Sequence, residues 1–487
     1  MKIKYIDSDL NPDQHEIGIV HIGLGAFHRA HQAVYLEKTL AQHGGDWMIA
    51  SANIRSNYSL VEQLQQAKHR YHVVEYADTK TVAIREIKAI KTAYFSGSND
   101  GCAGLLAQMS SESTKIVTLT VTEKGYYLSP LSGALLTDNA NIQHDLQNPA
   151  QPKTALGLIL VALKQRRSQG FEPFTVLSCD NMPHNGERTR GAVIALAQMQ
   201  DIEFADWIEK TVAFPNSMVD RIVPAVSEQD LIMIQADTGI SEPTVVKCEQ
   251  FSQWVVEDHF PAGRPQWESA GVQMVDNVSS YEMMKLRMLN GSHSLLAYLG
   301  YIAGYQTVAQ AMQDRDIRAF LEHYMMQEVA PTLPYFSQSE LATYCQQLLA
   351  RFDNDSLQHQ LQQIAMDGSQ KLPQRWLSGL IELQNKSLPA PAIELGIAGW
   401  IVFLSQAKEK KQKINDPLEV ALLELLHRHS SSSKGLVSAM LQRHDIFPTS
   451  LSTNHPLIQR VLNLVDRLSA GENIQRVMRT AFQNKDK

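Results

Sequence analysis

The hydrophobic pattern divides the chain into two parts with different periods. Up to residue 277, short apolar runs such as residues 17–22 and 115–121 alternate with segments of helical spacing. Alternation of this kind is typical of a parallel sheet covered by helices. Beyond residue 277 the strand-like runs stop and helical spacing continues. A chain of 487 residues also exceeds the size of one growing core. We therefore expect an α/β domain over residues 1–277 and a mostly α-helical domain over residues 278–487.

The same pattern predicts individual elements. Strands are expected at residues 17–22, 47–53, 71–76, 81–87, 115–121, 174–178 and 248–260. Residues 71–87 form a plausible hairpin insertion across their short polar turn. Helices are expected at residues 57–64, 154–169, 283–303, 307–330, 340–351, 356–365, 376–385, 392–408 and 418–429. Residues 367–375 interrupt these helices with polar and cationic side chains, so we expect a loop there that could close over an anionic substrate.

The first apolar run ends in a glycine-containing turn. Gly23 and Gly25 follow Ile22 directly, and a helix is expected to begin near Phe27. Glycines in such a turn let the backbone approach a pyrophosphate at the N-terminus of the helix. The third glycine of the usual fingerprint is absent, so a plain strand-to-helix turn stays open as the alternative. The expected cofactor contacts are Ile22, Gly23, Gly25, Ala26 and Phe27.

Two later strands end in polar residues. Asn53 and Arg55 occupy the place where an acidic residue would bind the ribose of NAD, so charge leaves NAD and NADP both possible. Arg55 could even receive a 2'-phosphate. Thr122, Glu123 and Lys124 follow the strand at residues 115–121, at a carboxyl end where ligands of α/β sheets collect. We therefore predict that all five residues lie near a Rossmann-like dinucleotide site.

The helical part begins with an apolar run, residues 281–304, that contains the polar residues Glu282, Lys285, Asn290 and His293. On an α-helix at about 100° per residue they fall within an arc of roughly 140°. Apolar neighbours are expected to lower the pKa of Lys285 towards neutrality, which would make its amine a general base. Asn290 can hold an oxygen that develops charge, and His293 can donate or accept. Buried residues satisfied by their neighbours are the alternative.

Two residues of the first domain are candidates for the same chemistry. Asn181 follows the strand at residues 174–178 and is either a second amide at the mouth of the sheet or a turn-forming residue. Asp220 and Arg221 lie in apolar surroundings, as a structural ion pair or as an orienting pair for a site. A non-catalytic dinucleotide sensor that binds a protein partner would need none of these groups.

Composition narrows the class of protein. The hydrophobic content of 44% and charged content of 20% are ordinary for a globular enzyme. The net charge of −7 without a basic block argues against nucleic acid as a partner. No apolar run approaches the roughly 20 residues of a membrane helix, and no signal core is seen, so we expect a cytoplasmic protein. The four cysteines are too widely spaced for a disulfide framework or a zinc motif, and we expect no metal.

With these residues in view, the sequence resembles the polyol-specific long-chain dehydrogenase family over nearly its whole length. The resemblance rests on residues 23–31 (GLGAFHRAH), residues 120–126 (TVTEKGY), residues 178–181 (SCDN) and the spacing Lys285-x4-Asn290-x2-His293. It implies a nucleotide-binding N-terminal domain, a helical C-terminal domain, and hydride transfer without a metal. It further implies NAD as the usual cofactor and a small sugar acid or polyol as the substrate.

The resemblance also implies a role for each site residue. Lys285 would be the general acid/base, Asn181 and Asn290 would polarise the reacting oxygen, His293 would fix a neighbouring hydroxyl, and Glu282 would relay protons to solvent. Asp220 matches a family aspartate at the site, and Lys371 matches a cation that contacts substrate. Residues 283–290 and 367–375 look most like those of fructuronate-reducing members, which implies interconversion of D-fructuronate and D-mannonate. Lys371 or Arg375 would then meet the substrate carboxylate. Mannitol 2-dehydrogenase activity is the alternative, since those members share every catalytic residue named.

Overall fold

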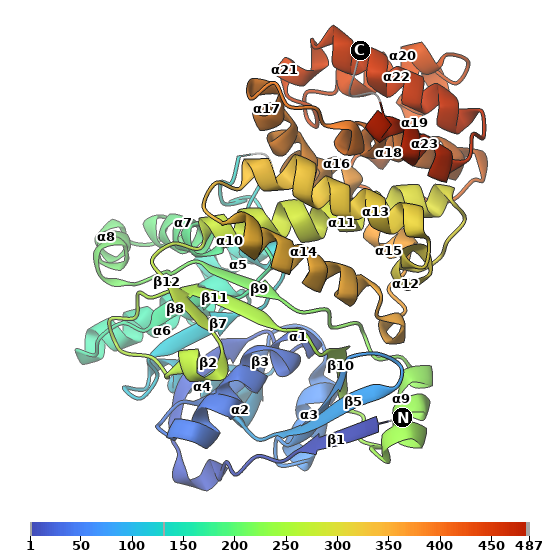
Figure 1. Cartoon of the computed structure of the whole chain (residues 1–487). Helices are drawn as coiled ribbons and strands as arrows, with labels where there is room; N and C mark the ends of the chain where they lie inside the picture. The colour runs from blue at the N-terminus through green and yellow to red at the C-terminus, as the bar shows by residue number, and fades with distance from the viewer. Residues whose placement is uncertain (1, 130–131, 484–487) are drawn as a thin grey trace. The chain divides into compact units, whose positions relative to one another are not determined.

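The computed structural model describes residues 2–129 and 132–483 of the chain (Figure 1). The chain divides into two compact units, Met1–Ser279 and Ser280–Lys487. The first alternates strands and helices, and the second is helical, as the hydrophobic pattern indicates. Each unit has its own buried core. The two larger apolar clusters of the first unit lie on opposite faces of one sheet.

That sheet has five parallel strands in the order β6-β3-β2-β7-β8. The strands are β2 (Ile17–Ile22), β3 (Met48–Asn53), β6 (Ile90–Phe95), β7 (Ile116–Leu119) and β8 (Thr175–Ser178). In chain order this is 3-2-1-4-5, which matches the first five strands of the Rossmann order 3-2-1-4-5-6. The order reverses between β2 and β7, and ligands of open α/β sheets bind at the carboxyl ends of strands beside such a reversal.

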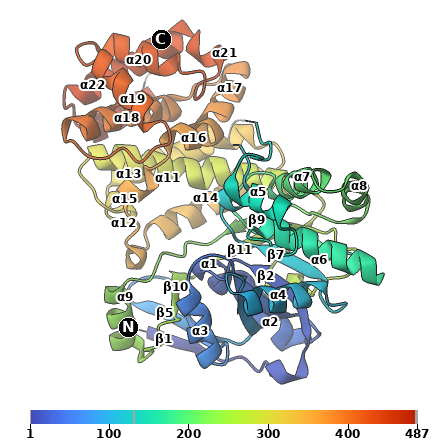
Figure 2. The same cartoon turned by 180° about the vertical axis from the view of Figure 1, so that it is seen from behind.

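Period-two alternation along the strands supplies both faces of the sheet. Val20 and Ile22 belong to one apolar cluster, whereas Ile19 belongs to the other. The first face is covered by α4 (Asn99–Ser110), α6 (Ala155–Gln169), α7 (Asn185–Gln198) and α8 (Ile202–Thr211), with α4 and α6 packed side by side (Figure 2). The second face is covered by α1 (Ala26–Ala30), α2 (Gln32–His43) and α3 (Tyr58–Gln66). Strands buried on both faces explain their nearly continuous apolar runs.

Two smaller sheets complete the first unit. The expected hairpin is present: β4 (Tyr71–Tyr76) and β5 (Thr81–Ile87) pair antiparallel with Tyr71 opposite Ile87. β1 (Lys2–Ile6) and β10 (Val246–Glu249) extend it on either side. The single strand expected at residues 248–260 is two strands, β10 and β11 (Gln253–Glu257). β11 joins β9 (Ser217–Asp220) and β12 (Gln273–Val275) in a three-stranded sheet.

The helical unit is built around apolar segments from its whole length. Its principal helices are α10 (Ser279–Met284), α11 (Gly291–Leu295), α12 (Val308–Met312), α13 (Arg315–His323), α14 (Gln338–Phe352), α16 (Gly368–Leu372), α17 (Ser378–Asn385), α18 (Pro391–Glu409), α19 (Glu419–Arg428), α20 (Ser433–Leu441), α22 (His455–Ser469) and α23 (Ile474–Gln483). α18 packs most extensively against α22 (Figure 1). Among the described helices, none combines the length and the apolarity that a bilayer crossing requires.

Three expectations for this unit are wrong. The helix expected at residues 356–365 is only a 3-10 turn, Asp355–Leu357, and a short helix, α15 (Leu361–Ile364). Residues 367–375 are not a loop: α16 is followed without a break by a π-helical turn, Pro373–Leu377. Asp367 adopts the left-handed conformation that starts this helix, and Leu372 and Trp376 are buried, so its apolar residues outweigh its polar composition. The helix expected over residues 307–330 is also interrupted. α12 ends at Met312, and the separate helix α13 continues into a π-helical turn, Tyr324–Val329. Asp314, which accepts hydrogen bonds from the N–H groups of residues 316 and 317, caps α13 and forces that break.

Candidate active site

The glycine turn after β2 is shaped by the neighbouring strand. Gly23 has φ +113°, and a Cβ there would lie 2.1 Å from the carbonyl oxygen of Thr120, so no other residue fits. Its N–H donates to the carbonyl of Ala52 on the other side, at 2.8 Å. Gly23 therefore allows the chain to leave the sheet between its two neighbours.

Gly25 differs, because the fold itself does not require it. Its backbone is extended, and a Cβ there would meet only the Gly23 carbonyl oxygen, at 3.8 Å. Gly25 is the residue directly before α1, and the backbone N–H groups at the N-terminus of a helix attract a phosphate. The space that its missing side chain leaves fits a pyrophosphate group at this turn. Ile22 is fully buried in the sheet beneath, and Ala26 and Phe27 form the first turn of α1.

The position of the missing third glycine has a structural explanation. His28 stacks on His21 with ring centroids 3.4 Å apart, and both side chains are fully buried. His21 Nε2 donates to the carbonyl of Gly23 at 3.0 Å, while Nδ1 lies 2.7 Å from the hydroxyl of Thr118. Burial lowers the pKa of His21 to about 3, so both bonds belong to the neutral ring. This stacked pair supports the turn from inside, where a fingerprint glycine would pack a helix against the strand.

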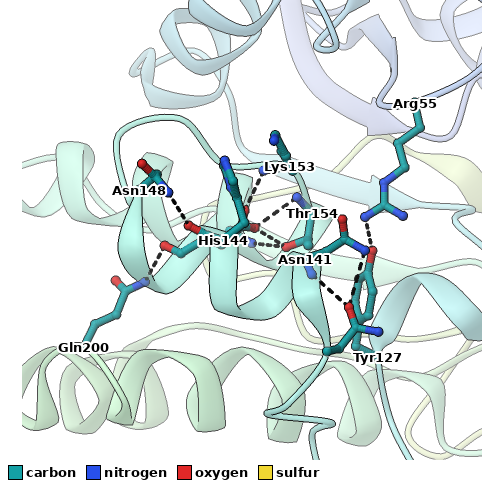
Figure 3. Close-up of polar contacts among 11 residues, drawn as sticks. Arg55, Tyr127, Asn141, His144, Asn148, Lys153, Thr154 and Gln200 are labelled. Atoms are coloured by element: carbon teal, nitrogen blue, oxygen red, sulfur yellow. Dashed lines mark hydrogen bonds and ion pairs between the residues drawn. The ribbon is translucent and has the colours of Figure 1, made fainter.

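At the end of β3, Asn53 is buried and its Nδ2 has no hydrogen-bond partner among the described residues. A buried amide without a partner is costly, and a ribose hydroxyl would satisfy it. Arg55 is exposed and donates to the hydroxyl of Tyr127, over whose ring its guanidinium lies, 5.7 Å from the centroid (Figure 3). Tyr127 thus holds the guanidinium of Arg55 in place.

The polar segment after β7 is held by one carboxylate. Thr122 has φ +65°, which a β-branched residue rarely adopts, and its N–H donates to Asp180 Oδ1 at 2.9 Å. Val121 N–H donates to Oδ2 of the same group at 2.9 Å, and the hydroxyl of Tyr126 donates to it at 2.7 Å. Burial raises the pKa of Asp180, and these three donors oppose that rise.

Glu123 and Lys124, which follow Thr122, are both exposed on a short 3-10 turn, Glu123–Tyr126. Asp180 lies two residues beyond the end of β8, and Asn181, the residue after it, is exposed. One buried carboxylate therefore holds the backbone of Val121 and Thr122 and directly precedes Asn181. Sequence reasoning assigned no role to Asp180. Its place directly before Asn181, just beyond the strand predicted at residues 174–178, was the available signal.

Asp220 and Arg221 do not form the ion pair that was one reading of the sequence. Asp220 ends β9 and is buried. The guanidinium of Arg221 instead donates to the carboxylate of Glu75 at 2.8 Å and to the carbonyl of Glu249. Arg221 thus joins the end of β9 to the sheet that contains the hairpin.

In the helical unit, the candidate catalytic residues lie on one continuous helix that is not α-helical throughout. Residues 285–290 form a π-helical turn, preceded by α10 and followed by α11. In a π-helix residue i bonds to i+5, so residues five apart lie nearly above one another. Lys285 and Asn290 are five apart, whereas an α-helix would separate them by about 140°.

The flanking α-helical turns extend the same line. Glu282 precedes Lys285 by three residues, and His293 follows Asn290 by three, spacings that are neighbours on an α-helix. The spacing of three, five and three therefore places all four side chains on one stripe, provided that the middle step is a π-turn. All four are buried. The α-helical arc expected from the sequence is corrected here to a tighter stripe.

Two other residues of this helix are explained by structure. Arg287 lies on the same turn but donates to the carboxylate of Glu382 at 2.6 Å and to the carbonyl of Thr332. Gly291 is helical, with φ −63° and ψ −45°, so it does not bend the segment. A Cβ at Gly291 would lie 2.0 Å from the hydroxyl oxygen of Tyr324, which shows that this glycine admits a side chain from a neighbouring helix.

The environment of His293 is cationic. Its ring is buried against Phe352, with centroids 4.9 Å apart, and Nε2 has no hydrogen-bond partner among the described residues. Burial lowers the pKa of His293 well below its usual value, and the neighbouring basic groups of His359, Arg375, Arg351 and Lys371 lower it further. His293 is therefore a neutral ring with an open nitrogen among four basic side chains.

Arg375 and Lys371 approach this ring from the segment that was expected to be a loop. Arg375 Nη1 donates to the carbonyl of Asn290 at 3.1 Å and to the hydroxyl of Ser294 at 2.8 Å. Burial lowers the pKa of Arg375 to about 10, so it is still a cation at neutral pH. Lys371 Nζ donates to the carbonyl of Ile364 at 3.3 Å. Arg351 and His359 had no signal in the sequence, because Arg351 belongs to α14 and His359 to the connection before the short helix Leu361–Ile364.

Two family models match the chain. Residues 17–269 match the mannitol dehydrogenase Rossmann domain, and residues 277–469 match the mannitol dehydrogenase C-terminal domain. The chain belongs to the mannitol dehydrogenase family. Members of this family are oxidoreductases, and the resemblance stated from residues 23–31, 120–126 and 178–181 is confirmed.

Relatives within the mannitol dehydrogenase family differ in what their names say. D-mannonate oxidoreductase of Escherichia coli (strain K12) is 43% identical over 451 residues, 92% of each chain. The uncharacterized oxidoreductase YeiQ of the same organism is 44% identical over 446 residues, 91% of this chain and 90% of its own. The mannitol 2-dehydrogenase of Pseudomonas fluorescens, solved as a ternary complex with NAD and D-mannitol, superposes with a TM-score of 0.84 at 33% identity, over 99% of this chain and 97% of that chain.

Proposed function

We propose that this mannitol dehydrogenase family member interconverts D-fructuronate and D-mannonate with NAD(H). In this proposal residues 1–277 bind the dinucleotide and residues 278–487 supply the acid/base and most of the substrate contacts. The family membership and the relative named D-mannonate oxidoreductase support the reaction class. The basic side chains around His293 support the choice of a charged substrate.

The dinucleotide turn fits NAD on structural grounds. The open position at Gly25 leaves room for a pyrophosphate, and the unsatisfied amide of buried Asn53 suits a ribose hydroxyl. The remaining proposed contacts are Ile22, Gly23, Ala26, Phe27, Arg55, Thr122, Glu123, Lys124 and Asp220. Bound NAD(H) would supply or accept the hydride at the secondary alcohol carbon.

Proton transfer is assigned to the polar stripe. Lys285 Nζ would give a proton to the substrate oxygen during reduction and take it back during oxidation. The amides of Asn290 and Asn181 would donate hydrogen bonds to the same oxygen, which stabilises the charge that develops there. Glu282, one turn before Lys285, would pass the proton to solvent. His293 Nε2, which has no partner among the described residues, would bind a neighbouring hydroxyl.

The feature that carries the substrate choice is the cation Arg375. It bonds only to neutral groups, Asn290 and Ser294, and no ion pair to it is found among the described residues. A partly buried guanidinium without an acid partner is costly, and a substrate carboxylate would remove that cost. Lys371 lies on the preceding helical turn, so the carboxylate would meet two cations.

Mannitol 2-dehydrogenase activity is the second candidate. It is favoured by the structural likeness to the enzyme whose complex contains NAD and D-mannitol. A polyol, however, offers no charge to Arg375. The two functions predict opposite responses to removing the substrate charge.

The deciding experiment follows NADH oxidation with D-fructuronate, its methyl ester and D-fructose at equal concentrations. The ester keeps the carbon skeleton and removes the charge. We expect kcat/KM for D-fructuronate to exceed that for both neutral ketones by roughly ten- to a hundredfold, the range for a hydrogen-bonded charge. Equal or greater efficiency with D-fructose would overturn the uronate assignment.

A further inference from the structure

The π-helical turn of Lys285 is held by side chains that hydrogen-bond to its backbone. The hydroxyl of Tyr324 donates to the carbonyl of Arg287 at 2.7 Å. Arg375 donates to the carbonyl of Asn290 at 3.1 Å, and Trp376 Nε1 donates to the carbonyl of Gly291 at 3.2 Å. Three side chains thus serve three carbonyls within five residues.

These donors act where a π-turn is weakest. A π-helical turn inserted between α-helical turns shifts the backbone hydrogen bonds by one residue. Carbonyl groups near the shift therefore lose the N–H donors that an α-helix would give them. A buried carbonyl without a donor is costly. Tyr324 and Trp376 are fully buried, and both come from other π-helical turns, Tyr324–Val329 and Pro373–Leu377.

Gly291 makes the closest of these approaches possible. A Cβ there would lie 2.0 Å from the hydroxyl oxygen of Tyr324 and 3.0 Å from its Cζ. Only a glycine directly after Asn290 therefore lets the Tyr324 hydroxyl cross the helix surface and reach the Arg287 carbonyl. Tyr324 favours the π-helical turn by donating a hydrogen bond to its backbone, and Gly291 favours it by leaving space for the Tyr324 hydroxyl.

We infer that Tyr324 is a positioning residue for the reaction, which, with Gly291 and Trp376, sets the π-helical register that aligns Lys285 with Asn290. An α-helical register would rotate Asn290 about 140° away from Lys285. The register thus decides whether the base and the amide act on the same oxygen. This inference rests on the proposed role of Lys285.

The test compares Tyr324→Phe with Tyr298→Phe in the full-length enzyme. Tyr298 is equally buried, and its hydroxyl contacts the carbonyl of Ala365 at 3.4 Å, outside the turn. We expect Tyr324→Phe to lower kcat by about ten- to a hundredfold, the cost of a small misplacement of reacting groups. It should also shift the pH profile of kcat and leave KM for NADH unchanged. Tyr298→Phe should retain wild-type kcat and profile.

Gly291→Ala supplies a second measurement. Because its Cβ meets the Tyr324 hydroxyl, Gly291→Ala should reduce kcat less in the Tyr324→Phe background than in the wild type, which a double-mutant cycle measures. If Tyr324→Phe does not fold, Trp376→Phe removes the donor to Gly291 and should change kcat and its pH profile in the same direction.

The outcomes separate this inference from the proposed function. Wild-type kcat and pH profile in both Tyr324→Phe and Trp376→Phe, with Lys285→Ala inactive, would overturn the positioning role alone. An active Lys285→Ala variant would instead overturn the assignment of Lys285.

Discussion

Asp180 holds Thr122 at a positive φ of +65° by accepting its backbone N–H at 2.9 Å. The same carboxylate precedes Asn181, so it connects the proposed cofactor segment to a proposed catalytic amide. An amide in its place has one oxygen acceptor and an NH₂ that cannot accept from the second N–H, that of Val121.

Asp180→Asn should therefore lower kcat/KM for the ketone substrate by about tenfold or more and raise KM for NADH, as expected for lost bonds to a charged group. Asp145→Asn is the matched control: Asp145 is equally a buried acceptor for two backbone N–H groups, those of Lys153 and Thr154. Steady-state kinetics and thermal unfolding of both variants check this. Asp145→Asn should lose stability only, and identical kinetics in the two variants would contradict the role of Asp180.

Lys285→Ala should lower kcat by about 10²- to 10⁴-fold, the usual contribution of a general acid/base. Nucleotide binding, measured by NADH fluorescence, should be retained because Lys285 belongs to the helical unit. Lys408→Ala is the control, since Lys408 is a partly buried lysine whose Nζ donates to the carbonyl of Leu426 at 2.9 Å. Near-wild-type turnover of Lys285→Ala with hexuronates and polyols would show that the mechanism is wrong.

Arg375→Met should distinguish two roles of Arg375, binding of the substrate carboxylate and positioning of Asn290. Loss of a hydrogen-bonded charge should reduce kcat/KM for D-fructuronate by roughly ten- to a hundredfold. The activity with the methyl ester or D-fructose should fall less, because these ketones have no charge to lose. Arg460→Met, which removes an exposed arginine paired with Glu394, is the control. An equal loss with charged and neutral ketones would mean that Arg375 acts only through Asn290.

Cofactor preference should favour NADH over NADPH. Arg55 already donates to Tyr127, and family resemblance implies NAD. Kinetics with both cofactors, for the wild type and for Arg55→Ala, check this expectation. Comparable efficiency with NADPH that disappears in Arg55→Ala would show instead that Arg55 accepts a 2'-phosphate.

Buried neutral histidines should make stability depend on pH. Burial lowers the pKa of His21 from 6.5 to about 3 in the folded state, so the unfolded chain binds a proton first as pH falls. Stability is therefore fully present above pH 6.5 and declines between 6.5 and 3, by up to about 1.4 kcal/mol per pH unit for each such histidine. Urea unfolding at several pH values measures the slope.

His21→Gln should reduce that slope, because one titrating group is lost. His444→Gln, at an exposed position, should leave it unchanged. A slope that is the same in wild type and His21→Gln would contradict the assigned neutral state of His21.

The sequence by itself determined the architecture and the polar groups that are candidates for the chemistry. Apolar runs with period two place Ile19 and Val20 on opposite faces of the sheet, and polar residues directly after those runs must lie at its carboxyl edge. These are local patterns, since the side-chain direction of a strand alternates whatever the rest of the chain does. The spacing of Lys285, Asn290 and His293 is likewise readable along the chain.

Only the tertiary structure decided how that spacing is used. α- and π-helical registers differ by one residue per turn, and residues 285–290 are compatible with either. The choice depends on Tyr324 and Trp376, which lie 37 residues from Arg287 and 85 residues from Gly291 along the chain. For the same reason, the contact between Arg375 and Asn290 could not be predicted from the sequence, and residues 367–375 were expected to form a loop. Contacts over such distances follow from packing, which local periodicity does not encode.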